Sequence, residues 1–324
     1  MKLFSFRRTI VATLLGLGLL IVLALTRPTP VAQAGGTIGT GSFTSCLTNL
    51  DATLQNAIDT GGLITFNCGP NPVVLTITEK TVTSTITIDG GSLVNLSSNF
   101  NRHFNVDNGG RLRLFNIELR NGDEGAGSGG SIFVGQLGAL ETNNTRFINN
   151  RAGEGSGGAI LAILGPITIT NSFFQGNLTQ AGDGGAIESS GPVTISNSQF
   201  IQNTSVSFGG AISGSGPMNI TGSQFISNTA SSGAGAIFAN DVLNLTGSLV
   251  VSNSINGFSL SIGPGIVGSI NSKLNIHQTT IEANVDLGLG FQPGGGLHVE
   301  GQALLRNSTV YNNSAWGGGG VYVA

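Results

Sequence analysis

Apolar and polar residues alternate in short windows that recur along most of the chain. In a typical window Ile167 and Ile169 flank Thr168, so the first and third positions are apolar and the second is polar. This period of two is typical of a β-strand that turns one face to a core. The windows begin at Ile86, Leu112, Leu140, Ile167, Val193, Met218, Leu243, Leu274 and Ala303, at spacings of 25 to 31 residues. A repeat of this length indicates a solenoid.

Three further positions of the window carry a regular residue type. The fifth is mostly Asn or Gly, as at Asn171 and Gly222, and both tolerate the positive φ of a tight turn. The eighth is apolar and the eleventh is Asn. These two columns are Phe147, Phe174, Phe200, Phe225, Val250, Ile281 and Val310, and Asn150, Asn177, Asn203, Asn228, Asn253, Asn284 and Asn313. If coils stack about 4.8 Å apart, the columns form an aromatic ladder and a hydrogen-bonded amide ladder.

A motif of small residues precedes most windows. Gly158-Ala159-Ile160 and Gly210-Ala211-Ile212 predict a sharp backbone turn followed by a side chain that fills the interior. Three strand-like pieces per coil predict an all-β fold, a right-handed parallel β-helix of about nine coils over residues 86–324. The sequence lacks the Leu/Asn pattern of a leucine-rich repeat, and a propeller blade would need four strands in about 40 residues.

The first 34 residues have the pattern of a signal peptide. Lys2, Arg7 and Arg8 form a positive start, an apolar run follows over residues 9–25, and Ala32-Gln33-Ala34 offers a cleavage site. The alternative is an uncleaved membrane anchor, although the run is short for a span of about 20 residues. We therefore expect an extracellular or cell-surface protein.

Residues 35–85 read as an N-terminal cap. Leu47, Leu50, Leu54 and Ile58 recur at helical spacing. We expect one short helix that covers the open apolar end of the strand array. Its start would be capped by Thr44 or Ser45 and its end by Gly61-Gly62, and strands are predicted over residues 63–66 and 74–78.

The chain has two cysteines, Cys46 and Cys68. Because both lie in the exported part, where disulfides persist, we predict that they form a bond that pins the cap to the first strand.

Charged residues make up only 9% of the sequence. Residues 1–34 hold four basic residues and no acidic ones, so the remainder carries nine basic and sixteen acidic residues. This balance excludes the basic surface that nucleic-acid binding needs. Membrane contact is expected only through the signal segment.

The paired motifs Gly-Gly-Ala-Ile and Phe-x-x-Asn carry a resemblance to a known family. Gly209-Gly210-Ala211-Ile212 and Phe225-Ile226-Ser227-Asn228 are similar to the repeats of bacterial polymorphic outer-membrane proteins, and residues 86–324 resemble bacterial β-helix surface proteins. The resemblance implies a secreted, surface-exposed protein with a role in adhesion.

Members of that family continue into an outer-membrane barrel, whereas this sequence ends at Ala324. We expect a form without the barrel. The alternatives are a truncated piece of a larger surface protein, or a protomer that pairs end to end through an uncapped C-terminus.

Acidic residues in the turns of adjacent coils suggest one metal site. Asp123, Glu124, Glu154 and Asp183 could converge on a calcium ion, and the alternative is a solvated loop edge. No other cofactor is expected.

Signals of catalysis are weak. His277 and Arg306 are expected to form a surface pair in neighbouring coils, and His103 and His298 are also expected at the surface. The sequence contains no Gly-x-Ser-x-Gly, phosphate-binding loop or zinc spacing. These observations favour a non-catalytic protein, with a polysaccharide lyase or glycoside hydrolase as the alternative.

Two surfaces are candidates for binding. Thr and Asn residues at the second and fourth positions predict a flat, uncharged strip that suits a repetitive ligand such as a glycan or ice. This strip consists of Thr168, Thr170, Thr194, Ser196, Asn219 and Thr221. The alternative is that these residues simply suit an exposed strand. Phe258 and Phe291, in the longest insertions, are candidate anchors for a partner unless they fold back onto the coil.

The sequence thus predicts a secreted or cell-surface β-helix protein with a binding, adhesion or structural role. Its expected partner is a glycan or the surface of a host or neighbouring cell.

Overall fold

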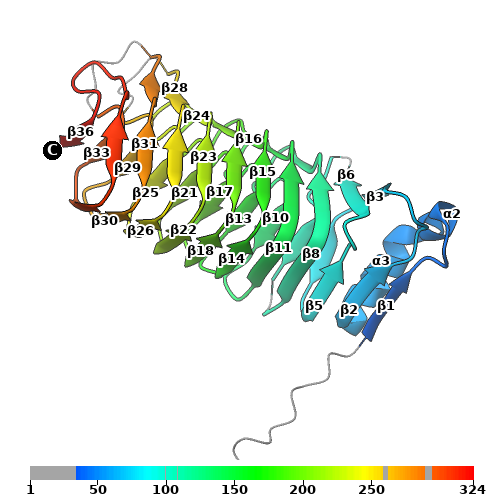
Figure 1. The fold of residues 1–324 in the computed structure, drawn as a ribbon. Coiled ribbons are helices and arrows are strands. Elements are labelled where there is room, and N and C mark those ends of the chain that lie inside the picture. The colour runs from blue at the N-terminus through cyan, green and yellow to red at the C-terminus, as the bar shows by residue number, and fades with distance from the viewer. Residues whose placement is uncertain (1–33, 99, 108, 258–261, 289–293) are drawn as a thin grey trace, which may run out of the picture. The chain divides into compact units, whose positions relative to one another are not determined.

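The computed structural model describes residues 34–98, 100–107, 109–257, 262–288 and 294–324, which belong to one unit. In this unit short strands stack in parallel as the coils of an all-β solenoid, as the repeat predicts (Figure 1). The predicted signal peptide, apart from Ala34, lies outside the described residues, and so do Phe258 and Phe291.

One sheet contains a single strand from every coil. Its ten strands are β4 (Lys80–Val82), β7 (Phe104–Val106), β10 (Ile132–Val134), β13 (Ile160–Ala162), β17 (Ile187–Ser189), β21 (Ile212–Gly214), β25 (Ile237–Ala239), β29 (Ile266–Gly268), β33 (Leu297–Val299) and β36 (Val321–Val323). The solenoid therefore has about ten coils. The prediction was about nine because β4 precedes the first window, in the predicted cap.

A sheet of 19 strands forms two adjoining walls of the coils. The first wall is β1 (Ala34–Ile38), β2 (Gly62–Phe66), β5 (Thr85–Asp89), β8 (Arg111–Arg120), β11 (Ala139–Ile148), β14 (Ile167–Thr170), β18 (Val193–Ser196), β22 (Met218–Thr221), β26 (Val242–Thr246), β30 (Lys273–His277) and β34 (Gln302–Arg306). The second wall is β3 (Val73–Ile77), β6 (Val94–Ser98), the distal halves of β8 and β11, β15 (Phe173–Gln175), β19 (Gln199–Ile201), β23 (Gln224–Ile226), β27 (Leu249–Val251), β31 (Thr280–Glu282) and β35 (Thr309–Tyr311).

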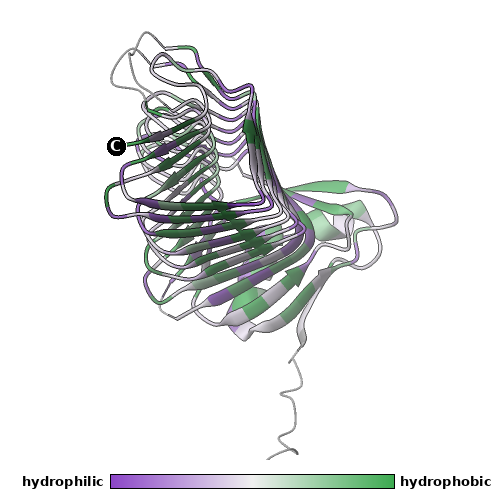
Figure 2. Ribbon diagram, turned by 60° about the vertical axis from the view of Figure 1, so that its left-hand side comes forward, coloured by the Kyte–Doolittle hydropathy of each residue, from purple (hydrophilic) through white to green (hydrophobic). Residues whose placement is uncertain are grey.

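Two-residue strands form a third sheet. They are β9 (Asp123–Glu124), β12 (Arg151–Ala152), β16 (Leu178–Thr179), β20 (Thr204–Ser205), β24 (Thr229–Ala230), β28 (Ser254–Ile255) and β32 (Val285–Asp286). Residues of like hydropathy lie one above another in successive coils (Figure 2). Each strand pairs with the strand one repeat later, so equivalent window positions are neighbours.

The eleventh-position asparagines form the predicted ladder inside the solenoid. Asn177 Nδ2 donates to Asn203 Oδ1 at 2.8 Å and to the carbonyl oxygen of Phe147 at 3.0 Å. The backbone N–H of Asn177 also donates to Asn203 Oδ1. The same pattern runs through Asn150, Asn177, Asn203, Asn228, Asn253, Asn284 and Asn313. These bonds satisfy polar groups that would otherwise be buried without partners.

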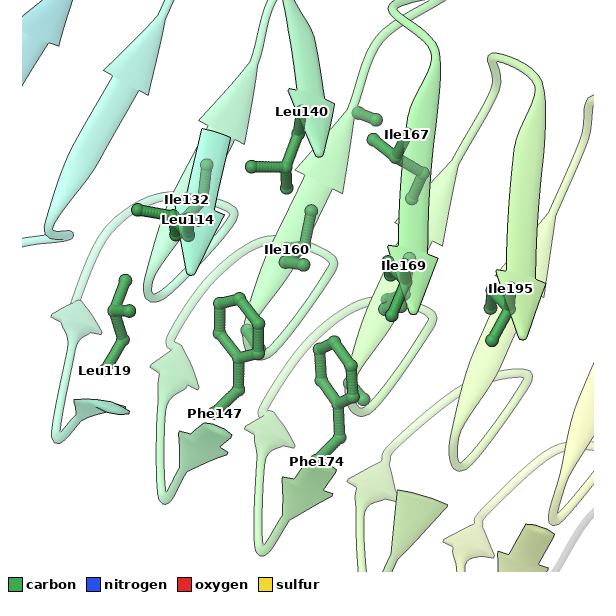
Figure 3. Packing of buried hydrophobic residues seen from close by; sticks show 14 of the residues in the cluster. Leu114, Leu119, Ile132, Leu140, Phe147, Ile160, Ile167, Ile169, Phe174 and Ile195 are labelled. Carbon is green, nitrogen blue, oxygen red and sulfur yellow. The ribbon is translucent and has the colours of Figure 1, made fainter. Parts of the chain in front are cut away.

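The eighth-position phenylalanines stack as predicted. The ring centroids of Phe147 and Phe174 are 4.6 Å apart, and those of Phe174 and Phe200 are 4.7 Å apart. Leu119 precedes them in the same column, and the column packs against isoleucines of the other walls (Figure 3). The distance between stacked rings matches the separation of neighbouring strands. The register that pairs the backbones of adjacent coils therefore also aligns the side chains of the core.

Two columns of left-handed residues turn the coil, and only one was predicted. The fifth position has positive φ, for example 49° at Asn171. The tenth position does as well, at Asn149, Gly176, Gln202, Ser227, Ser252, Ala283 and Asn312. The second column has no common residue type, so the sequence carries no signal for it. The asparagine ladder follows each of these residues directly, and its hydrogen bonds stabilise the turn.

A column of buried hydroxyls at the sixth position was also not predicted. The backbone N–H of Ser172 donates to Ser198 Oγ at 3.0 Å, and the bond repeats at Ser223 and Ser248. Since Ser is common on exposed strands, its burial follows only from the turn at the preceding residue.

Glycine is required where one coil approaches the next. A Cβ at Gly210 would overlap the carbonyl oxygen of Gly235, and Gly158 meets Gly185 in the same way. The small-residue motif therefore reflects backbone contact between coils.

The cap contains two helices where one was predicted. They are α2 (Phe43–Leu47) and α3 (Leu50–Thr60), separated at Asn49, which has a φ of 47°. The predicted N-caps are wrong, because Ser42 caps α2 and Ser45 completes its capping box. Gly61 ends α3 as expected.

Helix α3 covers the end of the core as predicted. Leu54 and Ile58 are buried in the same apolar cluster as the coils. The buried amine of Lys80 pairs with Asp51 of α3 at 2.5 Å. The Cys46–Cys68 disulfide is present and links α2 to the residues after β2, which confirms the predicted pairing.

The ladder generates a prediction about stability. Replacing Asn203 by Ala removes its hydrogen bonds and leaves buried donors of Asn177 without partners, so we expect a loss of about 3 kcal/mol or more in the free energy of unfolding. Chemical denaturation would measure it. The control is Asn197→Gly, at an exposed position of positive φ in the same coil, which should change stability by less than about 1 kcal/mol. Equal losses in the two variants would contradict the account.

Candidate ligand-binding surface

The six residues of the predicted strip lie together on the outer face of β14, β18 and β22. Thr168 is opposite Thr194, and Thr194 is opposite Asn219. The second column contains Thr170, Ser196 and Thr221 in the same register. The inward residues of these strands are buried, so alternation directs all six side chains outward.

The side chains of the strip are accessible and uncharged. Those of Thr168, Thr194 and Asn219 are exposed, while those of Thr170 and Ser196 are half-buried. Ser196 Oγ donates to Thr170 Oγ1 at 3.3 Å, which orders the second column. β-Branched threonines also have few rotamers, so the surface is well ordered before any ligand binds.

An amide ladder extends the strip toward later coils. Asn244 Nδ2 donates to Asn219 Oδ1 at 2.7 Å, and Asn275 Nδ2 donates to Asn244 Oδ1 at 2.8 Å. The array of donors and acceptors therefore repeats at the coil spacing over five strands, from β14 to β30.

Toward earlier coils the strip meets a band of ion pairs. Six of the nine basic residues after residue 34 lie between residues 102 and 151. Glu141 lies opposite Thr168 and pairs with Arg113 at 3.1 Å. Other pairs join Arg102 to Glu124, Arg146 to Glu118 and Arg151 to Asp123. These arginines are neutralised by carboxylates.

A small polar hollow lies beside this band. It has a volume of about 160 Å³ and is lined by Asn95, Asn116, Asn144, Glu118 and Arg146. Sequence reasoning missed it because it combines an enlarged turn between β5 and β6 with residues one coil apart. The available signal was the opposite charge of Glu118 and Arg146 at the seventh position of successive windows.

A larger hollow, of about 400 Å³, lies in the cap beside the disulfide. Phe43, Pro70, Pro72 and Val74 contribute to its lining, which contains no charged side chain. The smaller hollow, which contains Glu118 and Arg146, is therefore the better candidate for binding a polar ligand.

The four acidic residues proposed for calcium do not come together. Asp123 pairs with Arg151 at 2.9 Å and Glu124 with Arg102 at 3.3 Å, while Asp183 Oδ1 accepts from the N–H of Phe208. Among the described residues no group of three or more His, Cys, Asp or Glu side chains is placed to hold a metal. Calcium binding stays a prediction.

The predictions that His103 and His298 lie at the surface are wrong. His103 is fully buried, with Nδ1 3.0 Å from Ser131 Oγ and Nε2 3.1 Å from the carbonyl oxygen of Leu96. Burial lowers the pKa of His103 to about 4. His298 is only 3% exposed because its ring stacks on Tyr322 and because Gly263 and Gly294 lie close to its Cβ.

His277 and Arg306 are register partners on β30 and β34, as expected. His277 Nε2 lies 3.4 Å from the side-chain nitrogen of Asn307.

Glu188 is a half-buried acid that sequence reasoning missed. It points outward from β17 between its register partners Leu161 and Ser213, and its Oε2 is buried without a hydrogen-bond partner. Burial raises the pKa of Glu188 to about 7, and the nearby Asp183 charge acts in the same direction. It lies between two repeat windows, after the small-residue motif, and its outward strand position gave no hint of burial.

No helix in the described ranges is long and apolar enough to cross a membrane. Comparison with protein families, curated proteins and solved structures finds no match to this chain.

Glu188 generates a prediction about pH. Its folded-state pKa lies above its ordinary value of 4.5, so it favours folding below pH 4.5, and this contribution is lost as the pH rises through about 7. The free energy of unfolding should therefore fall by up to about 3 kcal/mol more in the wild type than in Glu188→Gln over that range. Denaturation at several pH values would measure it. The opposite contribution of His103 is common to both proteins and cancels, so identical pH profiles would refute the assignment.

Proposed function

We propose that the chain is an exported β-helix protein that binds an extended, uncharged polysaccharide along the Thr/Asn strip without changing it chemically. The observation that carries this proposal is the register of β14, β18 and β22, which stacks Thr168, Thr194 and Asn219 in one column and Thr170, Ser196 and Thr221 in the other.

A repetitive surface suits a repetitive ligand. Each coil adds a hydroxyl or amide at the same position along its strand. A polysaccharide that runs along the stack therefore meets similar hydrogen-bond partners in successive coils. The strip has no formal charge, which favours neutral sugars over uronates or sulfated chains. Because the side chains of the strip are already ordered in the free protein, less side-chain entropy is lost when a ligand binds.

The proposed location is outside the cell. It rests on the signal-peptide pattern of residues 1–34 and on the resemblance of the Gly-Gly-Ala-Ile and Phe-x-x-Asn repeats to those of polymorphic outer-membrane proteins. Binding of a glycan on a host or neighbouring cell would give such a protein an adhesive role.

Retention on insoluble polysaccharides would test the proposal. The wild type should be retained by at least one of cellulose, chitin, β-1,3-glucan or cross-linked dextran. The triple variant Thr170→Lys, Ser196→Lys and Thr221→Lys should bind at least about tenfold more weakly, because long charged side chains would replace the hydroxyls of one column. The matched control is Gln175→Lys, Gln199→Lys and Gln224→Lys, which adds the same charge to the outer face of the second wall and should bind like the wild type.

Failure of the wild type to bind any of these polysaccharides would contradict the proposal, and so would equal retention of the strip variant. Release of new reducing or unsaturated sugar ends would indicate instead a polysaccharide-active enzyme. Thermal hysteresis of ice growth without polysaccharide retention would indicate an ice-binding surface.

A further inference from the structure

The polar hollow is bounded on one side by an enlarged turn that the later coils lack. In most coils the two walls of the large sheet are joined through a single left-handed residue, such as Asn116 or Asn144. Between β5 and β6 four residues, 90–93, make this connection, with Ser92 at a φ of 61°. The larger turn places Ser92, Val94 and Asn95 along the hollow.

Glu118 is a fixed hydrogen-bond acceptor in the lining. Its side chain is only 14% exposed, and it lies between two guanidinium groups, with Arg146 Nε at 3.0 Å and Arg120 Nε at 3.5 Å. The Arg146 guanidinium also lies 4.7 Å from the centroid of the Phe173 ring. These contacts hold the carboxylate in place and offset the cost of its burial.

Amides form the rest of the polar lining. Asn144 Nδ2 donates to Asn116 Oδ1 at 2.8 Å, and Asn116 Nδ2 donates to Asp89 Oδ1 at 3.1 Å. Each amide has two donor hydrogens and an acceptor oxygen, so this ladder uses only part of their capacity. Val94 and Ile117 also line the hollow, each with only 3% of its surface exposed.

This combination matches a sugar ring, which has hydroxyls around its edge and C–H groups on its faces. The opposite charges of Glu118 and Arg146 cancel in the lining, so an uncharged ring is favoured. The volume of about 160 Å³ is well below the roughly 300 Å³ at which drug-sized sites begin, and it limits the occupant to about one ring.

The hollow is continuous with the strip. Asn144 follows Asn143, and Asn171 Nδ2 donates to Asn143 Oδ1 at 3.1 Å. Asn171 in turn follows Thr170, a strip residue. A ligand that extends from the strip toward earlier coils therefore reaches the hollow within two coils. The enlarged turn of residues 90–93 bounds the hollow on its far side.

We propose that the hollow binds the terminal sugar ring of the polysaccharide that the strip holds, so that the protein recognises chain ends. This inference rests on the proposed function and adds to it a subsite with end specificity.

The experiment measures binding by calorimetry of oligosaccharides prepared from whichever polysaccharide retains the wild type, and compares polymer samples of equal mass and different chain length. For the wild type, the number of binding sites per unit mass should rise as the chains become shorter, in proportion to their ends. Glu118→Gln should weaken oligosaccharide binding about tenfold and abolish this length dependence. Asn95→Ala truncates the register partner of Glu118 on β6, which lies outside the ion pairs, and should act in the same direction while those ion pairs stay in place.

Glu124→Gln is the matched control, since Glu124 is also paired with an arginine but lies on β9, outside the hollow and the strip. It should bind like the wild type. If the polymer is retained but the number of sites does not depend on chain length, or if both hollow variants bind normally, the end subsite is refuted and the strip stands. If the wild type binds neither polymer nor oligosaccharide, the proposed function itself fails.

Discussion

The inward asparagine ladder is the interaction on which the rest of the structure depends. Each amide oxygen accepts a hydrogen bond from the asparagine of the preceding coil, as Asn203 Oδ1 does from Asn177 Nδ2. Each amide nitrogen donates to the asparagine oxygen of the next coil and to a backbone carbonyl oxygen of the preceding coil, as Asn203 Nδ2 does to Asn228 and Phe174. Because these groups are buried, a slip of one residue would leave several of them unpaired, at a cost of about 1–3 kcal/mol each. The ladder thereby fixes the register of neighbouring coils, and the phenylalanine stack and the backbone contacts at glycines such as Gly210 follow from that register.

The same register organises the outer surface. Alternation along β14, β18 and β22 sends Ile169, Ile195 and Ile220 inward and the intervening polar residues outward, so an ordered core produces an ordered face. The Thr/Asn strip costs the fold little, since the strands already hold its side chains in place. Where the repeat is broken, at the turn of residues 90–93, the surface is hollowed. The repeated turn of the two following coils places Asn116 and Asn144 in the lining.

The parts of the structure that could be predicted are those in which residue type is tied to one position of the coil. Asn177 and Phe174 belong to columns that only stacking explains, and the parallel solenoid and the Cys46–Cys68 disulfide were predicted correctly. The second left-handed column was missed because its residues, such as Gln202 and Ser227, share no side-chain type; the hydrogen bonds of the asparagine that follows each of them stabilise the turn. The burial of His103 depends on its contacts with Ser131 and the carbonyl oxygen of Leu96, in a column where other coils have small residues. The partial burial of Glu188 depends on its neighbours in adjacent coils, and a strand pattern encodes neither environment. The sequence indicated the strip, because its residues recur at the same window positions. It did not indicate the hollow, because there Glu118 and Arg146 lie beside an enlarged turn that occurs outside the repeat pattern.

The measurement that tests the central claim most directly is an NMR titration of threonine methyl groups with an oligosaccharide of the retained polysaccharide. The account predicts that the signals of Thr168, Thr170, Thr194 and Thr221 shift together, because the coil register places them on one face. Thr204 and Thr229, on β20 and β24 of the third sheet, should keep their positions. Shifts at Thr204 and Thr229 with none at the four strip threonines would contradict the claim that this face binds the ligand.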